Sequence, residues 1–181
     1  MLKPLSGIRV LDLSRFYSGP HGTQLLAGLG AEVIRIDDPA SRMSQAKAPP
    51  FAGSKGVAMT PQTPDDLSIH YLKRNRGKKA ITLNLKSPDG VALFRQLAAK
   101  SDVVFENFTP GVAERLGISY GQLSDEFPRL IYCALTGWGS TGPDAGEKSY
   151  DPIAQAAAGL MSITGRAGDP PLKAGSPLSD G

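Results

Sequence analysis

Cysteine and histidine are scarce in this sequence. Its 181 residues include one cysteine, Cys133, and two histidines, His21 and His70. A single cysteine excludes an internal disulfide and a cysteine-rich zinc site, and the two histidines lack the spacing of a ligand pair. We therefore expect no bound metal.

Long apolar runs are also absent. No apolar stretch approaches the roughly 18 residues that a membrane-spanning helix needs, and the first seven residues lack the apolar core of a signal peptide. We expect a cytoplasmic protein, where a free thiol is normal. The formal net charge of +3 is too small to indicate a nucleic-acid partner.

Two common catalytic motifs are missing as well. The loop after the first expected strand, Ser14 to Pro20, is not G-x-G-x-x-G, and no G-x-S-x-G segment occurs. These absences argue against a dinucleotide site and against a serine-hydrolase elbow. Asp37 lies at the carboxyl end of the second expected strand, directly after it, where an acid can hold a ribose, but an acid at a strand end is common and the structural interpretation is favoured.

Short apolar runs alternate with segments of helical spacing. This pattern predicts a single α/β domain over residues 1–181, with a doubly wound, mainly parallel, Rossmann-like sheet and helices on both faces. The expected strands are 8–13, 31–36, 80–85, 102–105 and 130–135. The expected helices are 21–29, 87–100, 110–116, 120–126 and 151–163. The Pro-rich stretch 37–67 is expected to be an irregular surface excursion.

A basic run, KRNRGKK at residues 73–79, precedes the third strand. It has two interpretations: a solvated or nuclear-targeting face, or a phosphate-binding edge for a polyanionic ligand. Arg15 and Arg115 lie near strand–helix junctions, and the carboxyl ends of strands are where α/β sheets bind ligands. The residues by themselves therefore indicate a cleft for a phosphorylated molecule.

Seven segments of the chain, in order, resemble the family III CoA-transferases, the group that contains formyl-CoA transferase and carnitine CoA-transferase. They are PLSGIRVLDLSRFYSGP, LLAGLGAEVIRID, NRGKKAITLNLKSPDG, DVVFENFTPGVAERLG, PRLIYCALTGWGSTGP, SYDPIAQAAAGLMSITG and PPLKAGSPLSDG. The resemblance implies transfer of CoA between an acyl-CoA and a carboxylic acid. Coenzyme A would be a substrate, and no cofactor would be bound permanently.

The resemblance also implies site residues. The catalytic aspartate matches Asp180, which would form an aspartyl-CoA thioester, whereas Asp151 is interpreted as the N-cap of the helix that begins at Pro152. Asp38 stands where formyl-CoA transferase has an arginine, which Arg42 could replace. The CoA contacts carry over to Arg15, Phe16, Tyr17, Ser18, Leu83, Lys86, Asn107, Phe108, Arg115, Lys148 and Tyr150.

Three differences from the family keep alternatives open. Tyr17 replaces the glutamine of formyl-CoA transferase, which predicts a different acyl group. The related α-methylacyl-CoA racemases need a histidine where this chain has Tyr150, and tyrosine is a poor base at neutral pH. Family members are interlocked homodimers about twice as long. We therefore expect the N-terminal part of such an enzyme, with a racemase-like enzyme or a non-catalytic CoA-binding or assembly fragment as alternatives.

Overall fold

Five parallel strands form the central sheet of the computed structural model, which describes residues 3–40 and 48–177. These strands are β1 (Arg9–Asp12), β2 (Glu32–Asp37), β6 (Lys79–Thr82), β7 (Val103–Glu106) and β8 (Ile131–Ala134). Every neighbouring pair in the order β6-β2-β1-β7-β8 is parallel. The predicted parallel α/β sheet is therefore confirmed.

The strand order creates a crevice at one edge of the sheet. The chain starts at the central strand β1, moves outward through β2 and β6, and then crosses back to β7 and β8 on the other side of β1. In doubly wound sheets, this reversal separates the loops that leave the two strands on either side of it, and ligands bind between those loops. The reversal here lies between β1 and β7.

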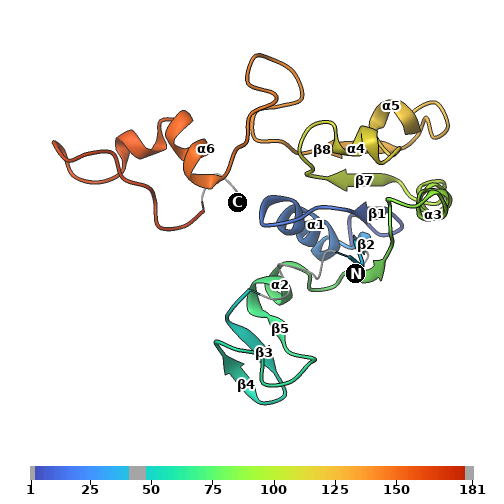
Figure 1. Cartoon of the computed structure of the whole chain (residues 1–181), viewed down its shortest axis with the longest axis horizontal. Helices are drawn as coiled ribbons and strands as arrows, with labels where there is room; N and C mark the ends of the chain where they lie inside the picture. Colours follow the sequence, from blue (N-terminus) through green and yellow to red (C-terminus); the bar gives the residue numbers. More distant parts are fainter. Residues whose placement is uncertain (1–2, 41–47, 178–181) are drawn as a thin grey trace.

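Helices cover both faces of the sheet, as predicted (Figure 1). They are α1 (Ser18–Gly28), α2 (Ile69–Arg74), α3 (Pro88–Ala98), α4 (Val112–Arg115), α5 (Tyr120–Leu123) and α6 (Asp151–Ala157). Side chains alternate along a strand. Leu11 accordingly packs into the core with Phe94 of α3 and Leu123 of α5, whereas Val10 packs on the opposite face with Leu26 of α1.

Local signals explain where the longer helices start and stop. Ser87 caps α3, because its hydroxyl accepts a 3.0 Å hydrogen bond from the Gly90 backbone nitrogen, and Pro88 follows at the first helical position. Helix α1 ends before Gly30, whose φ of +108° suits glycine and stops the helix. Both features were predicted from the sequence.

The excursion over residues 37–67 differs from the irregular segment that the sequence predicts. Three short strands, β3 (Phe51–Gly53), β4 (Gly56–Ala58) and β5 (Leu67–Ser68), form an antiparallel sheet in the order β4-β3-β5. Its turn is held by the Asp66 carboxylate, which accepts hydrogen bonds from the Gln62 and Thr63 backbone nitrogens. Such side-chain organisation of a turn is invisible to composition, which is why the Pro-rich stretch looked irregular.

The predicted helix 151–163 is two pieces. Helix α6 ends at Ala157, Gly159 takes a φ of +76°, and a 3-10 helix, η1 (Leu160–Ile163), follows. The N-cap of α6 is Tyr150, so the assignment of Asp151 as the cap is corrected by one residue. In Figure 1, α6 stands apart from the five-stranded sheet. Over residues 3–40 and 48–177, none of the helices combines the length and the apolarity required to cross a bilayer.

Candidate functional site

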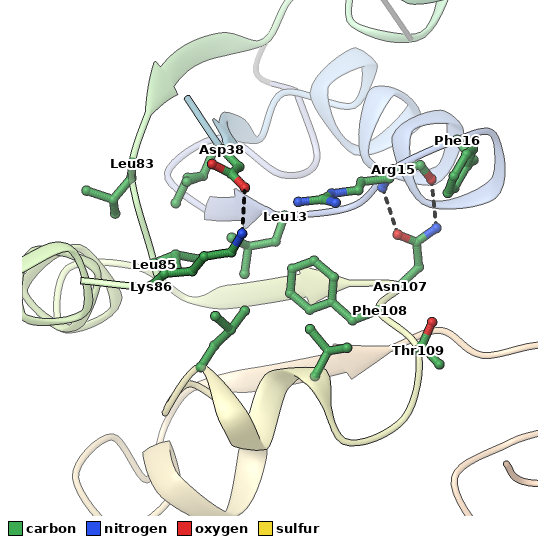
Figure 2. Close-up of a pocket in the computed structure, with 13 residues that line it drawn as sticks. Leu13, Arg15, Phe16, Asp38, Leu83, Leu85, Lys86, Asn107, Phe108 and Thr109 are labelled. Carbon is green, nitrogen blue, oxygen red and sulfur yellow. Dashed lines mark hydrogen bonds and ion pairs between the residues drawn. The ribbon is translucent and has the colours of Figure 1, made fainter. Parts of the chain in front are cut away.

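A cavity of about 280 Å³ opens where four strands of the parallel sheet end. It lies beside the strand reversal, between the segments that follow β1, β2, β6 and β7, with α4 as its outer wall (Figure 2). Its lining is Leu13, Arg15, Phe16, Ile36, Asp38, Leu83, Leu85, Lys86, Asn107, Phe108, Thr109, Val112 and Leu116. Most of these side chains are apolar, and two cations and one carboxylate accompany them.

Two loops of the cavity are joined to each other by hydrogen bonds. The Arg15 backbone nitrogen donates to Asn107 Oδ1 at 2.7 Å, and Asn107 Nδ2 donates to the Arg15 carbonyl at 2.7 Å. The Arg15 guanidinium lies 5.6 Å from the centre of the Phe108 ring, a cation–π distance. These contacts, visible in Figure 2, hold the loops after β1 and β7 in a fixed relation across the strand reversal.

The loop after β1 carries a strained, exposed aromatic residue. Phe16 has a φ of +66°, which is rare for a residue with a large side chain, and 59% of its surface is exposed. Its neighbour Tyr17 turns to other partners: the Arg74 guanidinium lies 4.2 Å from the Tyr17 ring centre, and the His21 ring centre lies 5.6 Å away. The loop therefore presents Phe16 to the cavity, while Tyr17 packs against α2 and α1.

Cations lie along the other side of the cavity. Lys86 Nζ is 4.0 Å from Asp38 Oδ2, a weak ion pair, and the Lys86 side chain is largely exposed. A second, more open cavity of about 800 Å³ shares Lys86 and adds Arg95 and Arg115. Arg95 is paired with Glu126. The two adjoining cavities thus form a cationic groove at the carboxyl ends of β6 and β7.

A buried carboxylate supports the floor of this site. Glu106, the last residue of β7, accepts a 2.6 Å hydrogen bond from the Phe108 backbone nitrogen and is 5% exposed. Burial raises the pKa of Glu106. The hydrogen bond fixes the turn that places Phe108 against Arg15. The ENF segment is visible in the sequence, but the structural role of its acid is not.

A buried ion pair lies beneath α1 and was also missed. Lys78 Nζ contacts Asp12 Oδ2, Thr23 Oγ1 and the Pro20 carbonyl, each at 2.8 Å, and the Lys78 side chain is 1% exposed. Burial lowers the pKa of Lys78. This lysine of the basic run therefore belongs neither to a solvated face nor to a phosphate-binding edge. The contacts of Lys78 hold the basic run against β1 and the first turns of α1.

The structure brings together only part of the predicted set. The cavity gathers six of the predicted residues, namely Arg15, Phe16, Leu83, Lys86, Asn107 and Phe108. Arg115 lines the adjoining cavity. Tyr17 and Ser18 lie at the start of α1, whereas Lys148 and Tyr150 are exposed in the segment before α6 and line neither cavity. Asp180 and Arg42 lie outside the described residues.

Two negative observations limit the chemistry of the described residues. Asp37, the possible ribose ligand, is engaged by Arg35, whose Nε lies 2.9 Å from Asp37 Oδ1, which supports the structural interpretation. Within the part of the chain that the structure describes, no three His, Cys, Asp or Glu side chains are grouped as metal ligands.

The sequence profile described as CoA-transferase family III matches residues 5–181. The chain is 39% identical over 180 residues to the human succinyl-CoA:glutarate CoA-transferase, and 42% identical over 179 residues to the succinate–glutarate CoA-transferase of Agrobacterium fabrum. These alignments cover 99% and 98% of this chain but 38% and 43% of the relatives. The chain thus spans about two fifths of the length of these curated relatives.

Solved structures give the same picture. A CaiB/BaiF family protein from Brucella suis aligns with a TM-score of 0.88 and 36% identity, covering 99% of this chain and 46% of that one. A protein from Mycobacterium tuberculosis aligns with a TM-score of 0.82 and 33% identity, covering 98% and 47%. The fold of the chain is therefore shared along nearly its whole length.

Proposed function

Because the chain belongs to CoA-transferase family III, we propose that it is the CoA-binding part of an enzyme that moves CoA from an acyl-CoA to a carboxylic acid. The observation that carries this proposal is the cavity at the strand reversal, where cationic and apolar groups converge within a segment matched by the family profile. The names of the relatives support the substrate class, since they specify succinyl-CoA with glutarate and formyl-CoA with oxalate.

The lining suits one end of a CoA molecule. The flat aromatic ring of a nucleotide base can lie between Leu83 and Phe108, and phosphate groups can pair with Lys86 and Arg115 along the groove. A cavity of about 280 Å³ is at the lower end of the range for small-molecule sites. We therefore place only part of CoA inside it, with the rest following the open groove and the pantetheine arm leading toward Asp180.

We assign the nucleophile to Asp180. Its carboxylate would attack the thioester carbonyl, breaking the carbon–sulfur bond and forming a mixed anhydride and a free CoA thiolate. The thiolate would then attack the aspartyl carbonyl, which releases the original acyl group as a carboxylate and leaves an aspartyl-CoA thioester. An acceptor carboxylate reverses both steps. Short dicarboxylic acids, by analogy with glutarate and oxalate in the names of the relatives, are the acceptors to test first.

We also infer self-association into a homodimer. The apolar side chains of Ile153, Ile163 and Leu172 are 42%, 81% and 51% exposed around α6 and η1, which stand apart from the sheet in Figure 1. Exposed apolar surface is a feature of association sites. Sedimentation velocity of the chain should show dimers or larger species, and a single monomeric boundary at all concentrations would contradict this inference.

Calorimetry with CoA tests the binding part of the proposal. Lys86→Glu should weaken CoA binding by about tenfold or more, because it places a negative charge beside the CoA phosphates. A tenfold change in affinity corresponds to about 1.4 kcal/mol. Lys100→Glu is the matched control, because this exposed lysine lies beyond the opposite end of α3 and should leave the affinity unchanged. Equal affinities of the parent and Lys86→Glu would show that CoA does not bind in this groove.

Mass spectrometry after incubation with succinyl-CoA tests the chemistry. The parent should acquire a CoA adduct, Asp180→Asn should lose it while still binding CoA, and Asp169→Asn, a change of an exposed aspartate, should retain it. An adduct that survives Asp180→Asn would refute the assignment of the nucleophile. CoA binding by a parent that forms no adduct with any acyl-CoA would instead favour a non-catalytic CoA-binding segment.

A further inference from the structure

Gln155 in α6 has an unusual environment for a helical glutamine. Its side chain is completely buried, with an exposed fraction of 0%, and both ends of its amide are engaged. Gln155 Nε2 donates to Asp151 Oδ2 at 2.7 Å and to the Ser176 carbonyl at 3.3 Å. Gln155 Oε1 accepts a hydrogen bond from the Ala174 backbone nitrogen at 2.9 Å. The amide is therefore hydrogen-bonded to the backbone at Ala174 and Ser176, about twenty residues further along the chain.

The hydrogen bonds of Gln155 join α6 to residues 170–177. Residues 170–177 contain no helix or strand. Among the described residues, the two hydrogen bonds with Gln155 are the backbone hydrogen bonds that join this segment to the rest of the chain. Lys173 adds a longer ion pair, with its Nζ 3.7 Å from Asp151 Oδ2. Since a buried amide without partners is costly, Gln155 and the segment depend on each other.

We propose that Gln155, supported by Asp151, is a positioning residue that fixes the backbone at Ala174 and Ser176 and so sets the point from which the chain reaches Asp180. Asp180 is four positions beyond Ser176 in the sequence, a span of at most about 14 Å. An anchor at Ser176 therefore limits where the carboxylate can go. This inference rests on the proposed function, in which Asp180 is the nucleophile, but the anchor itself can be tested without any reaction.

Three substitutions separate the parts of the anchor. Gln155→Met keeps a similar length and removes every hydrogen bond. Gln155→Glu keeps an acceptor for Ala174 but loses the donors and places a second carboxylate against Asp151, so that two like charges repel each other at neutral pH. Gln96→Met makes the same chemical change at an exposed glutamine of α3 and serves as the control.

Hydrogen–deuterium exchange of the 181-residue chain tests the anchor. The Ala174 amide should exchange about tenfold or more faster in Gln155→Met than in the parent or in Gln96→Met, while amides of β1 stay protected. If Gln155→Met does not fold, Gln155→Glu gives the answer: protection of Ala174 should increase as the pH falls, because a protonated carboxyl can donate to Asp151 as the amide does. Equal exchange at Ala174 in the parent and the folded variants would overturn the anchor.

The rate of CoA adduct formation tests the positioning role. Misplacement of a reacting group by about 1 Å can cost on the order of 100-fold in rate. Gln155→Met should therefore slow adduct formation by about that factor and leave the affinity for CoA within about twofold. An unchanged rate in a variant whose Ala174 amide has lost protection would refute the positioning role. A parent that forms no adduct at all, but shows the exchange difference, would contradict the proposed function and leave the anchor intact.

Discussion

Replacing Lys78 with methionine should destabilise the chain more than any other single change of a basic residue in the run 73–79. Lys78 Nζ and Asp12 Oδ2 form an ion pair at 2.8 Å, with exposed side-chain fractions of 1% and 0%. Lys78→Met keeps most of the aliphatic stem but leaves Asp12 as a buried charge without its counter-ion. The Pro20 carbonyl also loses the 2.8 Å hydrogen bond from Lys78 Nζ and keeps the one from Thr23 Oγ1 at 3.3 Å.

The size of the effect follows from what remains around Asp12. Removing one partner of a buried ion pair costs roughly 3–5 kcal/mol, because the other charge stays desolvated. Asp12 keeps hydrogen bonds from the Ser14 backbone nitrogen at 3.0 Å and from Thr23 Oγ1 at 2.7 Å. These donors place the expected loss near the lower end, about 3 kcal/mol, which for a chain of this length lowers Tm by about 6–12 °C.

Lys79→Met is a matched control in the adjacent residue. Lys79 also forms an ion pair, with Glu32, but 71% of its side chain is exposed and Glu32 keeps a 2.6 Å contact with Arg9. Exposed pairs contribute little because water and salt screen them. Thermal melts followed by circular dichroism should therefore show a large decrease in Tm for Lys78→Met and almost none for Lys79→Met.

A double variant keeps this reasoning testable if Lys78→Met fails to fold. Asp12→Asn combined with Lys78→Met removes both charges, and replacement of a buried ion pair by neutral groups is often close to neutral in stability. The double variant should recover at least half of the lost Tm. If Lys78→Met and Lys79→Met melt at the same temperature, or if the double variant is less stable than Lys78→Met, the buried pair does not have the energetic role assigned to it.

Two further predictions concern Glu106 and glycines in helices. The pKa of Glu106 is raised by burial, so the stability that this acid contributes is present below its unfolded pKa of about 4.3 and is lost as the pH rises through the folded value. Urea unfolding should accordingly show Glu106→Gln gaining stability relative to the parent between about pH 4 and neutral, and Glu147→Gln, a change of an exposed acid that does not act on Glu106, showing no such trend; a flat Glu106→Gln difference would contradict the burial argument. Gly90→Ala in α3 should lower Tm because an added Cβ would lie 1.9 Å from a backbone carbonyl oxygen, whereas Gly121→Ala in α5 meets nothing within 4 Å and should leave Tm unchanged or higher; an equal response of the two alanine variants would argue against the close approach at Gly90.

The fold was predictable where a local pattern carries the information. The strand 8–13 is a short apolar run bounded by turn residues, and the observed β1 lies inside it. Parallel pairing followed from the helices between successive strands, since a crossover returns the chain in the same direction. The resemblance to family III CoA-transferases, judged from seven ordered segments, is confirmed by the match over residues 5–181.

The errors arose where the local structure depends on side-chain contacts and backbone conformations that composition and apolar spacing do not reveal. The excursion 37–67 becomes a sheet partly because the Asp66 carboxylate organises the turn between its second and third strands. The helix predicted to run to Ile163 is interrupted at Gly159, whose left-handed backbone the apolar spacing did not reveal. No periodicity along the chain could indicate that Gln155 would contact Ala174.

In the candidate site, too, some residue positions could be predicted from the sequence and others could not. Arg15, Lys86 and Asn107 follow different strands, and because the carboxyl ends of parallel strands meet at one edge, their convergence could be expected before the structure. Lys148 and Tyr150 follow no strand directly. Their positions depend on the long loop before α6, and they line neither cavity. Their assignment to the CoA site stays a prediction.

Adjacent lysines of the basic run 73–79 lie on opposite faces of the sheet. Neighbouring residues on an extended chain point to opposite faces. Ala80 pairs with Arg35, on the α1 side of the sheet, and Lys78 shares that side because it is two residues from Ala80. Lys79 pairs with Ile34, on the α3 side, where Glu32 meets it. One residue of spacing therefore separates a buried structural charge beneath α1 from an exposed one, and the run does not act as a single cationic surface.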